Sequence, residues 1–87
     1  MAAPLHVLYF AWLRERAGRA EERLDLPADV RTVAELVAFL RARDAAGAAT
    51  FAEPSVVRCA VNQDLVGPDA PLVPGDEVAF FPPVTGG

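Results

Sequence analysis

The sequence predicts one small α+β domain in which a single main helix packs across a mixed β-sheet. Its 87 residues are enough for one hydrophobic core and too few for a second domain. One central segment has apolar residues at helical spacing, whereas five shorter segments are rich in apolar residues with the alternation of strands. We therefore expect the order strand, strand, helix, strand, strand, strand.

The first two strands are expected at residues 5–10 and 22–26, joined by a turn or short helical piece at 12–18. Alternation predicts that five side chains of these strands point toward the core: Leu5, Val7, Tyr9, Leu24 and Leu26. Pro27 ends the second strand. The two strands are predicted to form an antiparallel hairpin with a long connection.

The helix is expected to begin at Val33 and to end before Gly47. Thr32 followed by Glu35 fits a capping box, in which each side chain accepts a backbone N–H that the first turn leaves free. One apolar stripe is formed by Val33, Leu36, Val37 and Leu40. The charged side chains expected in solvent are Glu35, Arg41 and Arg43. Residues 45–54 form a loop or a short irregular helix.

The second half of the chain contains three more strands. They are expected at residues 56–62, 65–66 and 77–81. A tight turn at 62–64 joins the first two, and turn-forming residues precede the last. One helix across a mixed sheet in this order is similar to the β-grasp fold of ubiquitin. Residues 1–81 are then the β-grasp domain, and residues 82–87 are an extended C-terminal tail that leaves from a central strand.

The tail is the most distinctive part of the sequence. Pro82 and Pro83 carry no N–H, so they end sheet pairing and hold the chain extended. Gly86 and Gly87 lack a Cβ and fit a channel too narrow for side chains. The residues expected to insert into a partner are Pro82, Pro83, Val84, Thr85 and Gly86, with the main-chain carboxylate of Gly87 as the reactive group. The alternative is a loose end without function.

Composition excludes several classes of protein. A formal charge of −4 argues against nucleic-acid binding, which usually needs clustered positive charge. The sequence has no apolar run as long as a membrane span and no secretion signal, so we expect a cytoplasmic protein that does not bind membranes. A single cysteine excludes an internal disulfide and a multi-cysteine zinc site, and we expect no metal.

Few side chains suit catalysis. Cys59 alternates with apolar residues in a strand that we expect to be buried, so we expect its thiol to be inert. His6 is expected on the surface. The paired carboxylates lie beside turns or strand starts and are expected in solvent, namely Glu21, Glu22, Asp76 and Glu77. These residues favour a carrier over an enzyme.

Alternation also predicts a recognition surface. If the inward residues of the strands face the helix, Phe10 and Phe81 point to the opposite side, and Leu65 follows a turn nearby. Large outward apolar side chains usually mark a partner site. We expect Phe10, Leu65 and Phe81 to bind partners; the alternative is that some of them complete the core.

The run DEVAFFPPVTGG, residues 76–87, resembles the C-terminus of the molybdopterin synthase small subunits, which are ubiquitin-like sulfur carriers. The resemblance extends to residues 9–11, 14–15, 60–63 and 65–66. It implies that an adenylating enzyme activates Gly87 with ATP and that a sulfur donor then converts it to a thiocarboxylate. The thiocarboxylate would donate sulfur to cyclic pyranopterin monophosphate, which forms the dithiolene of molybdopterin for molybdenum cofactor biosynthesis.

The same resemblance implies that the catalytic side chains belong to a large subunit, into which the tail inserts, in a heterotetramer. This chain would bind no cofactor itself, since the activating enzyme uses the ATP. The large subunit and the activating enzyme would compete for the partner-binding patch. The alternatives are a sulfur carrier for thiamine, cysteine or tRNA thiolation, a ubiquitin-like protein modifier, or a plain interaction domain with an inert tail.

Overall fold

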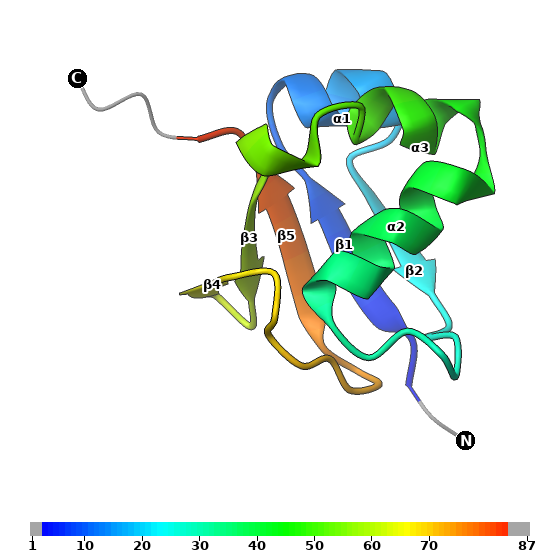
Figure 1. The fold of residues 1–87 in the computed structure, drawn as a ribbon, viewed down its shortest axis with the longest axis vertical. Coiled ribbons are helices and arrows are strands. Elements are labelled where there is room, and N and C mark those ends of the chain that lie inside the picture. The colour runs from blue at the N-terminus through cyan, green and yellow to red at the C-terminus, as the bar shows by residue number, and fades with distance from the viewer. Residues whose placement is uncertain (1–2, 84–87) are drawn as a thin grey trace.

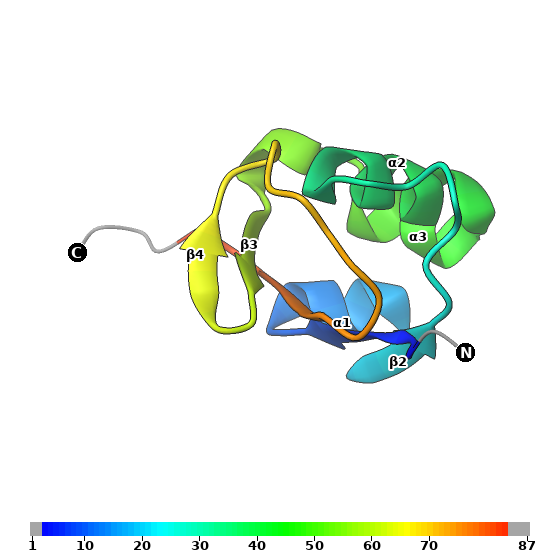
Figure 2. The same ribbon diagram turned by 90° about the horizontal axis from the view of Figure 1, so that it is seen from below.

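The computed structural model describes residues 3–83, which contain five strands and three α-helices. In chain order the elements are β1 (Leu5–Tyr9), α1 (Trp12–Ala17), β2 (Glu21–Leu24), α2 (Val33–Arg43), α3 (Ala45–Thr50), the 3-10 turn η1 (Pro54–Val56), β3 (Arg58–Val61), β4 (Asp64–Val66) and β5 (Glu77–Phe81). The strands form one mixed sheet, and α2 lies across one of its faces (Figures 1 and 2).

The strand order is β2-β1-β5-β3-β4, so the last strand of the chain lies in the middle of the sheet. β5 pairs parallel with β1 and antiparallel with β3, whereas the other two pairings are antiparallel hairpins. The predicted sheet, helix and central position of the last strand are therefore confirmed.

Three boundaries and one open region differ from the expectation. β1 ends at Tyr9, β2 ends at Leu24, and β3 begins only at Arg58 because η1 occupies the preceding residues. The open region, 45–54, contains the helix α3. The tight turn after β3 is confirmed, with two consecutive residues at positive φ, Asn62 and Gln63.

The core lies between the sheet and the helices. Its largest fully buried apolar side chains are Phe51, Phe80, Leu5, Leu13, Leu36, Leu40, Val7 and Val78. Phe80 of β5 packs edge-on against Phe51, with ring centroids 5.0 Å apart, and stacks with Tyr9 at 6.2 Å. Burial of one such side chain contributes about 1.5–3 kcal/mol, so the centre of the sheet is its most firmly held part.

The first turn of α2 is capped much as the sequence predicts. The Oγ1 of Thr32 accepts the N–H of Glu35 at 3.2 Å, and the N–H of Leu36 donates to the Thr32 carbonyl at 2.9 Å. The Glu35 carboxylate accepts the N–H of Arg31 at 2.8 Å. A capping box would instead join Glu35 to the N–H of Thr32, so the reciprocal bond lies one residue earlier than expected.

The connector 67–72 supplies partners for the rest of this turn. The N–H of Val33 donates to the carbonyl of Ala70 at 3.0 Å, and the N–H of Ala34 donates to the carbonyl of Pro68 at 2.9 Å. The first four N–H groups of an α-helix have no partner within the helix itself. The connector and the Thr32 side chain therefore satisfy the N–H groups of Val33, Ala34 and Glu35, and the N–H of Leu36 makes the first bond within the helix.

The expectation that Glu22 lies in solvent was wrong, whereas Arg43 is exposed as expected but forms an ion pair. The side chain of Glu22 is only 8% exposed, because β2 turns it toward the helices. Its carboxylate accepts the Tyr9 hydroxyl at 2.6 Å and two N–H groups of Arg43 at 2.8 and 3.0 Å. A charge at this depth is tolerated only when it is paired and hydrogen-bonded. The cluster thereby ties β1 and β2 to the end of α2.

This cluster also sets the titration of its members. Burial tends to raise the pKa of the Glu22 carboxyl, but hydrogen bonds from Arg43 and Tyr9 outweigh it and hold that pKa below its usual value. Burial and the bond to Glu22 together raise the pKa of the Tyr9 phenol. At neutral pH the cluster therefore contains a carboxylate, a guanidinium and a neutral phenol.

A glycine allows α3 to pack against α2. The carboxylate of Asp44 caps α3 by accepting the N–H of Gly47 at 2.7 Å. Gly47 is buried, and a Cβ added there would lie 1.8 Å from the carbonyl oxygen of Leu40. Only glycine permits this approach of the two backbones.

Replacing Gly47 with Ala should destabilise the fold by about 2 kcal/mol or more, because the new methyl group overlaps backbone that cannot move without separating the helices. Urea unfolding followed by Trp12 fluorescence measures this. Gly67→Ala is the matched control, since a methyl group there meets nothing within 4 Å. Equal unfolding midpoints for the two variants would contradict the close approach.

Acid should destabilise the protein through Glu22. Because its folded-state pKa is lowered, its stabilising contribution is complete above the unfolded pKa of about 4.3 and is lost as the pH falls through the folded pKa. Glu22→Gln should remove this acid dependence and reduce the unfolding free energy at pH 7 by about 1–3 kcal/mol. Urea unfolding from pH 7 to pH 3 measures both, with the exposed Glu21→Gln as control. An unaltered pH profile in Glu22→Gln would refute the assignment.

Candidate functional site

The C-terminal end of β5 is held at the middle of the sheet. β5 is hydrogen-bonded to β1 on one edge and to β3 on the other, and Phe81 is its last residue. Pro82 and Pro83 follow outside the strand (Figure 1). A strand paired on both edges with a buried face cannot slip in register. The domain therefore fixes the point at which the chain leaves the sheet.

The start of β5 is fixed as firmly as its end. The carboxylate of Asp76, which we expected in solvent, accepts the Asn62 side-chain amide and the N–H of Val73, both at 2.9 Å. Asn62 also accepts the N–H of Glu77 at 3.0 Å. These bonds tie the turn before β5 to the turn between β3 and β4.

The remaining tail residues, Val84, Thr85, Gly86 and Gly87, lie outside the described residues. Insertion of the segment from Pro82 to Gly86 into a partner and the reactive carboxylate of Gly87 therefore stay predictions. The fold contributes the position of the residues that precede them.

The face of the sheet opposite α2 carries an apolar patch. Val78 and Phe80 are fully buried on the helix side, so Ala79 and Phe81 face the other way. Strand register places Leu65 beside Ala60, Ala60 beside Ala79, and Ala79 beside Leu8. These residues, together with the neighbouring aromatic residues Phe10 and Phe81, form a surface that we call the open-face patch. Its members are Leu8, Phe10, Ala60, Leu65, Ala79 and Phe81.

The three predicted partner-binding residues all lie in this patch. Phe10 is 49% exposed and Leu65 is 71% exposed, whereas Phe81 is half-buried. The N–H of Phe10 donates to the carbonyl of Phe80 at 3.1 Å, which continues the parallel register and places Phe10 beside Phe81. Leu65 lies two strands away from β5 in a row that runs through Ala60 to Ala79, and Phe81 follows Ala79 by two residues along β5. The small residues of the patch were missed, although their period of two would have revealed them.

Charged residues border the patch. Arg58 is exposed and pairs with Phe81 across the two strands. At the other end of β1, Nε2 of His6 lies 2.6 Å from a carboxylate oxygen of Glu21. An apolar centre with a polar rim is the usual composition of a protein–protein interface. His6 is partly exposed, as predicted, but it has a partner on the neighbouring strand.

The described residues contain little that suits catalysis. Cys59 is 6% exposed, and burial raises its pKa to about 12, so at neutral pH it is a buried thiol rather than a nucleophile. Within residues 3–83, His, Cys, Asp and Glu side chains do not gather in any group of three that could hold a metal ion. The candidate site therefore consists of the open-face patch and the C-terminal end of β5.

None of the helices in residues 3–83 is long and apolar enough to cross a membrane.

Comparison with known proteins gives matches over nearly the whole chain. Residues 7–87 match the model of the ThiS family. The chain is 45% identical over 83 residues to the molybdopterin synthase sulfur carrier subunit of Escherichia coli K12, covering 95% of this chain and 99% of that protein.

Two solved structures have similar folds. The putative molybdopterin converting factor subunit 1 of Pyrococcus furiosus is 34% identical with a TM-score of 0.76, covering 95% of this chain and all of the other. SAMP1 of Haloferax volcanii, a small archaeal modifier protein, is 28% identical with a TM-score of 0.70, covering 98% of this chain and all of the other. These similarities confirm the predicted β-grasp fold.

Proposed function

This chain belongs to the ThiS family, in the group similar to molybdopterin synthase sulfur carrier subunits, and we propose that its C-terminal residue carries sulfur for molybdopterin synthesis. The family match carries the proposal, because it covers residues 7–87 and so includes both the domain and the diglycine. The central position of β5 supports it, since a rigid domain delivers the tail from a fixed point.

The proposed chemistry uses the main chain of Gly87. A carboxylate is a poor electrophile, so an adenylating enzyme first joins it to AMP from ATP, with release of pyrophosphate. A sulfur donor then displaces AMP and leaves a thiocarboxylate. Its sulfur forms a bond to a carbon of cyclic pyranopterin monophosphate, and an oxygen on that carbon leaves, as water or as the opened phosphate ester. Water then hydrolyses the resulting acyl–sulfur bond and regenerates the carboxylate. Two such transfers complete the dithiolene.

Partners supply the side chains for these steps in our proposal. The only thiol of the chain, that of Cys59, is buried and protonated at neutral pH. We propose that the large subunit holds the acceptor and that the tail enters its active site, in a heterotetramer with two copies of each subunit. This chain then binds no cofactor of its own, and ATP is bound by the activating enzyme.

We further propose that the open-face patch docks both the large subunit and the activating enzyme, which must therefore compete. Exposed Phe10 and Leu65 supply apolar anchors, and aromatic residues are enriched at such interfaces. Phe81 belongs to the patch and also precedes the tail, so docking fixes where the tail starts. A segment of six residues, the length of 82–87, would reach about 19 Å from that point if it were extended.

A second candidate function is protein modification. The similarity to SAMP1 of Haloferax volcanii, a small archaeal modifier protein, favours it. A modifier would share the activation of Gly87 by ATP but would pass it to the amine of a target lysine. The product would then be an isopeptide adduct rather than a free thiocarboxylate.

Loading of the tail is the decisive measurement. The purified chain is incubated with ATP, its activating enzyme and a sulfur source, and the mass of its C-terminal peptide is read. We expect replacement of one oxygen by one sulfur, and no change when Gly86 and Gly87 are deleted. A C-terminal mass that stays unaltered while the enzyme loads another carrier would exclude the sulfur-carrier function. Adducts to lysine in a cell extract would instead support the modifier.

Charges placed in the patch should prevent docking. Leu65→Asp and Phe81→Asp should each weaken binding to the large subunit by at least about thirtyfold, the loss of roughly 2 kcal/mol typical of a central anchor. Titration calorimetry measures the affinity, and urea unfolding confirms that the exposed Leu65 site leaves the fold intact. Val73→Asp is the matched control, because Val73 is 58% exposed and lies outside the patch. Undiminished affinity of Leu65→Asp would remove Leu65 from the interface.

A further inference from the structure

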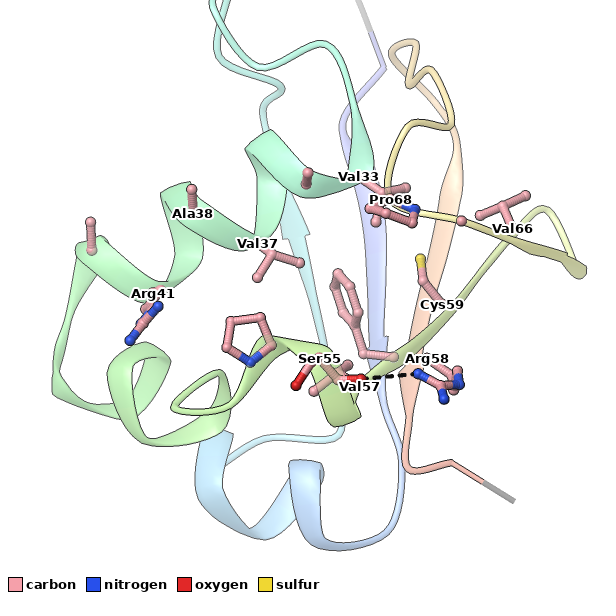
Figure 3. A pocket seen from close by; sticks show the side chains of 15 residues that line it. Val33, Val37, Ala38, Arg41, Ser55, Val57, Arg58, Cys59, Val66 and Pro68 are labelled. Atoms are coloured by element: carbon pink, nitrogen blue, oxygen red, sulfur yellow. Dashed lines mark hydrogen bonds between the residues drawn. The ribbon is translucent and has the colours of Figure 1, made fainter. Parts of the chain in front are cut away.

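The helix side of the sheet has a groove that the proposed function does not use. It lies between α2 on one side and β3 and β4 on the other, with η1 at one end and the start of the connector 67–72 at the other (Figure 3). Its volume is about 810 Å³, within the range of about 300–1,000 Å³ typical of binding sites. The open-face patch is on the opposite face of the sheet.

The walls of the groove are apolar. Val33, Val37 and Ala38 line it from α2, and Cys59 and Val66 line it from the strands (Figure 3). Val37 is half-buried and Ala38 is exposed, so this side of α2 is in contact with solvent rather than filled by the core. An apolar occupant would therefore remove apolar surface from water, which favours binding.

The charge of the groove is of one sign. Arg41 on α2 and Arg58 at the η1 end of β3 are among the lining residues, and within residues 3–83 no carboxylate lines the groove. Neither arginine forms an ion pair in this part of the chain, whereas Arg43 and Arg19 are both paired with Glu22. Arg58 donates only to the carbonyl of Ser55, at 3.1 Å. The groove is thus locally positive on a chain whose formal charge is −4.

We propose that the groove binds a short acidic amphipathic helix of a partner protein. The groove is open to solvent on one side, so its occupant needs an apolar side for the walls and a polar side for water. The α2 wall from Val33 to Arg41 is about 12 Å long, which matches about two turns of helix. Helix-in-groove recognition uses apolar residues at this spacing, and carboxylates beside them would pair with Arg41 and Arg58.

The groove and the open-face patch lie on opposite sides of the sheet and share one bordering residue, Arg58. Binding in the groove depends on Arg41 and on the apolar walls of the groove, and it does not depend on the chemistry of Gly87. Loading of the tail and binding in the groove are therefore separable by experiment.

The probe is a capped synthetic peptide with leucines at i, i+3, i+4 and i+7 and glutamates at the flanking positions. It is titrated into the full-length ¹⁵N-labelled chain, and amide shifts are followed. We expect saturable shifts centred on Ala38, Val66 and Gly67. A matched peptide with lysine in place of glutamate should bind at least about fivefold more weakly, since it meets two arginines.

Two variants test the groove itself. Ala38 is exposed, so Ala38→Arg places a long side chain in the groove and should abolish binding of the acidic peptide. Urea unfolding of this variant checks that the fold is kept. Arg41→Glu should lower the affinity for the acidic peptide by at least about fivefold and raise the affinity for the lysine peptide. Val73→Asp, outside the groove, should bind as the parent does. Lack of saturable binding, equal affinity for the two peptides, or shifts centred on the open-face patch would each overturn the proposal.

Discussion

The pairing of β5 between β1 and β3 is the constraint on which the rest of the structure depends. The helix-facing side chains of this strand, Val78 and Phe80, are fully buried, and Phe80 contacts both Tyr9 and Phe51. The opposite side of the same strand contributes Ala79 and Phe81 to the open-face patch. One strand thus joins the core, the open-face patch and the tail, so a shift of its register by one residue would exchange core and surface.

Periodicity in the sequence predicted the elements whose apolar pattern is local. The alternation in β1 and β5 and the stripe of α2 identified these two strands, the main helix and the outward position of Phe10, and the turn before Leu65 indicated its exposure. Glu22 escaped such reasoning because its partner Arg43 is far away in the sequence. In sequence the pair of glutamates is typical of a solvated strand start, and only the packing of α2 against the sheet makes one of them part of the core.

Small residues account for most of what the sequence did not predict. Gly47 argues against a helix on propensity, yet it lies inside α3 because the carbonyl of Leu40 leaves no room for a Cβ. Ala60 and Ala79 carry too little apolar surface to mark the patch that they complete. The groove between α2 and β3 is formed by elements far apart in the chain, so its volume and its charge follow from tertiary packing alone.

The connector 67–72 has a consequence for nucleotide chemistry. Helix N-termini hold phosphate groups when their first N–H groups are free to donate. At the start of α2 the N–H groups of Val33, Ala34 and Glu35 already donate to the connector or to the Thr32 side chain. A triphosphate would have to break those bonds, so this end of the main helix offers it no cradle.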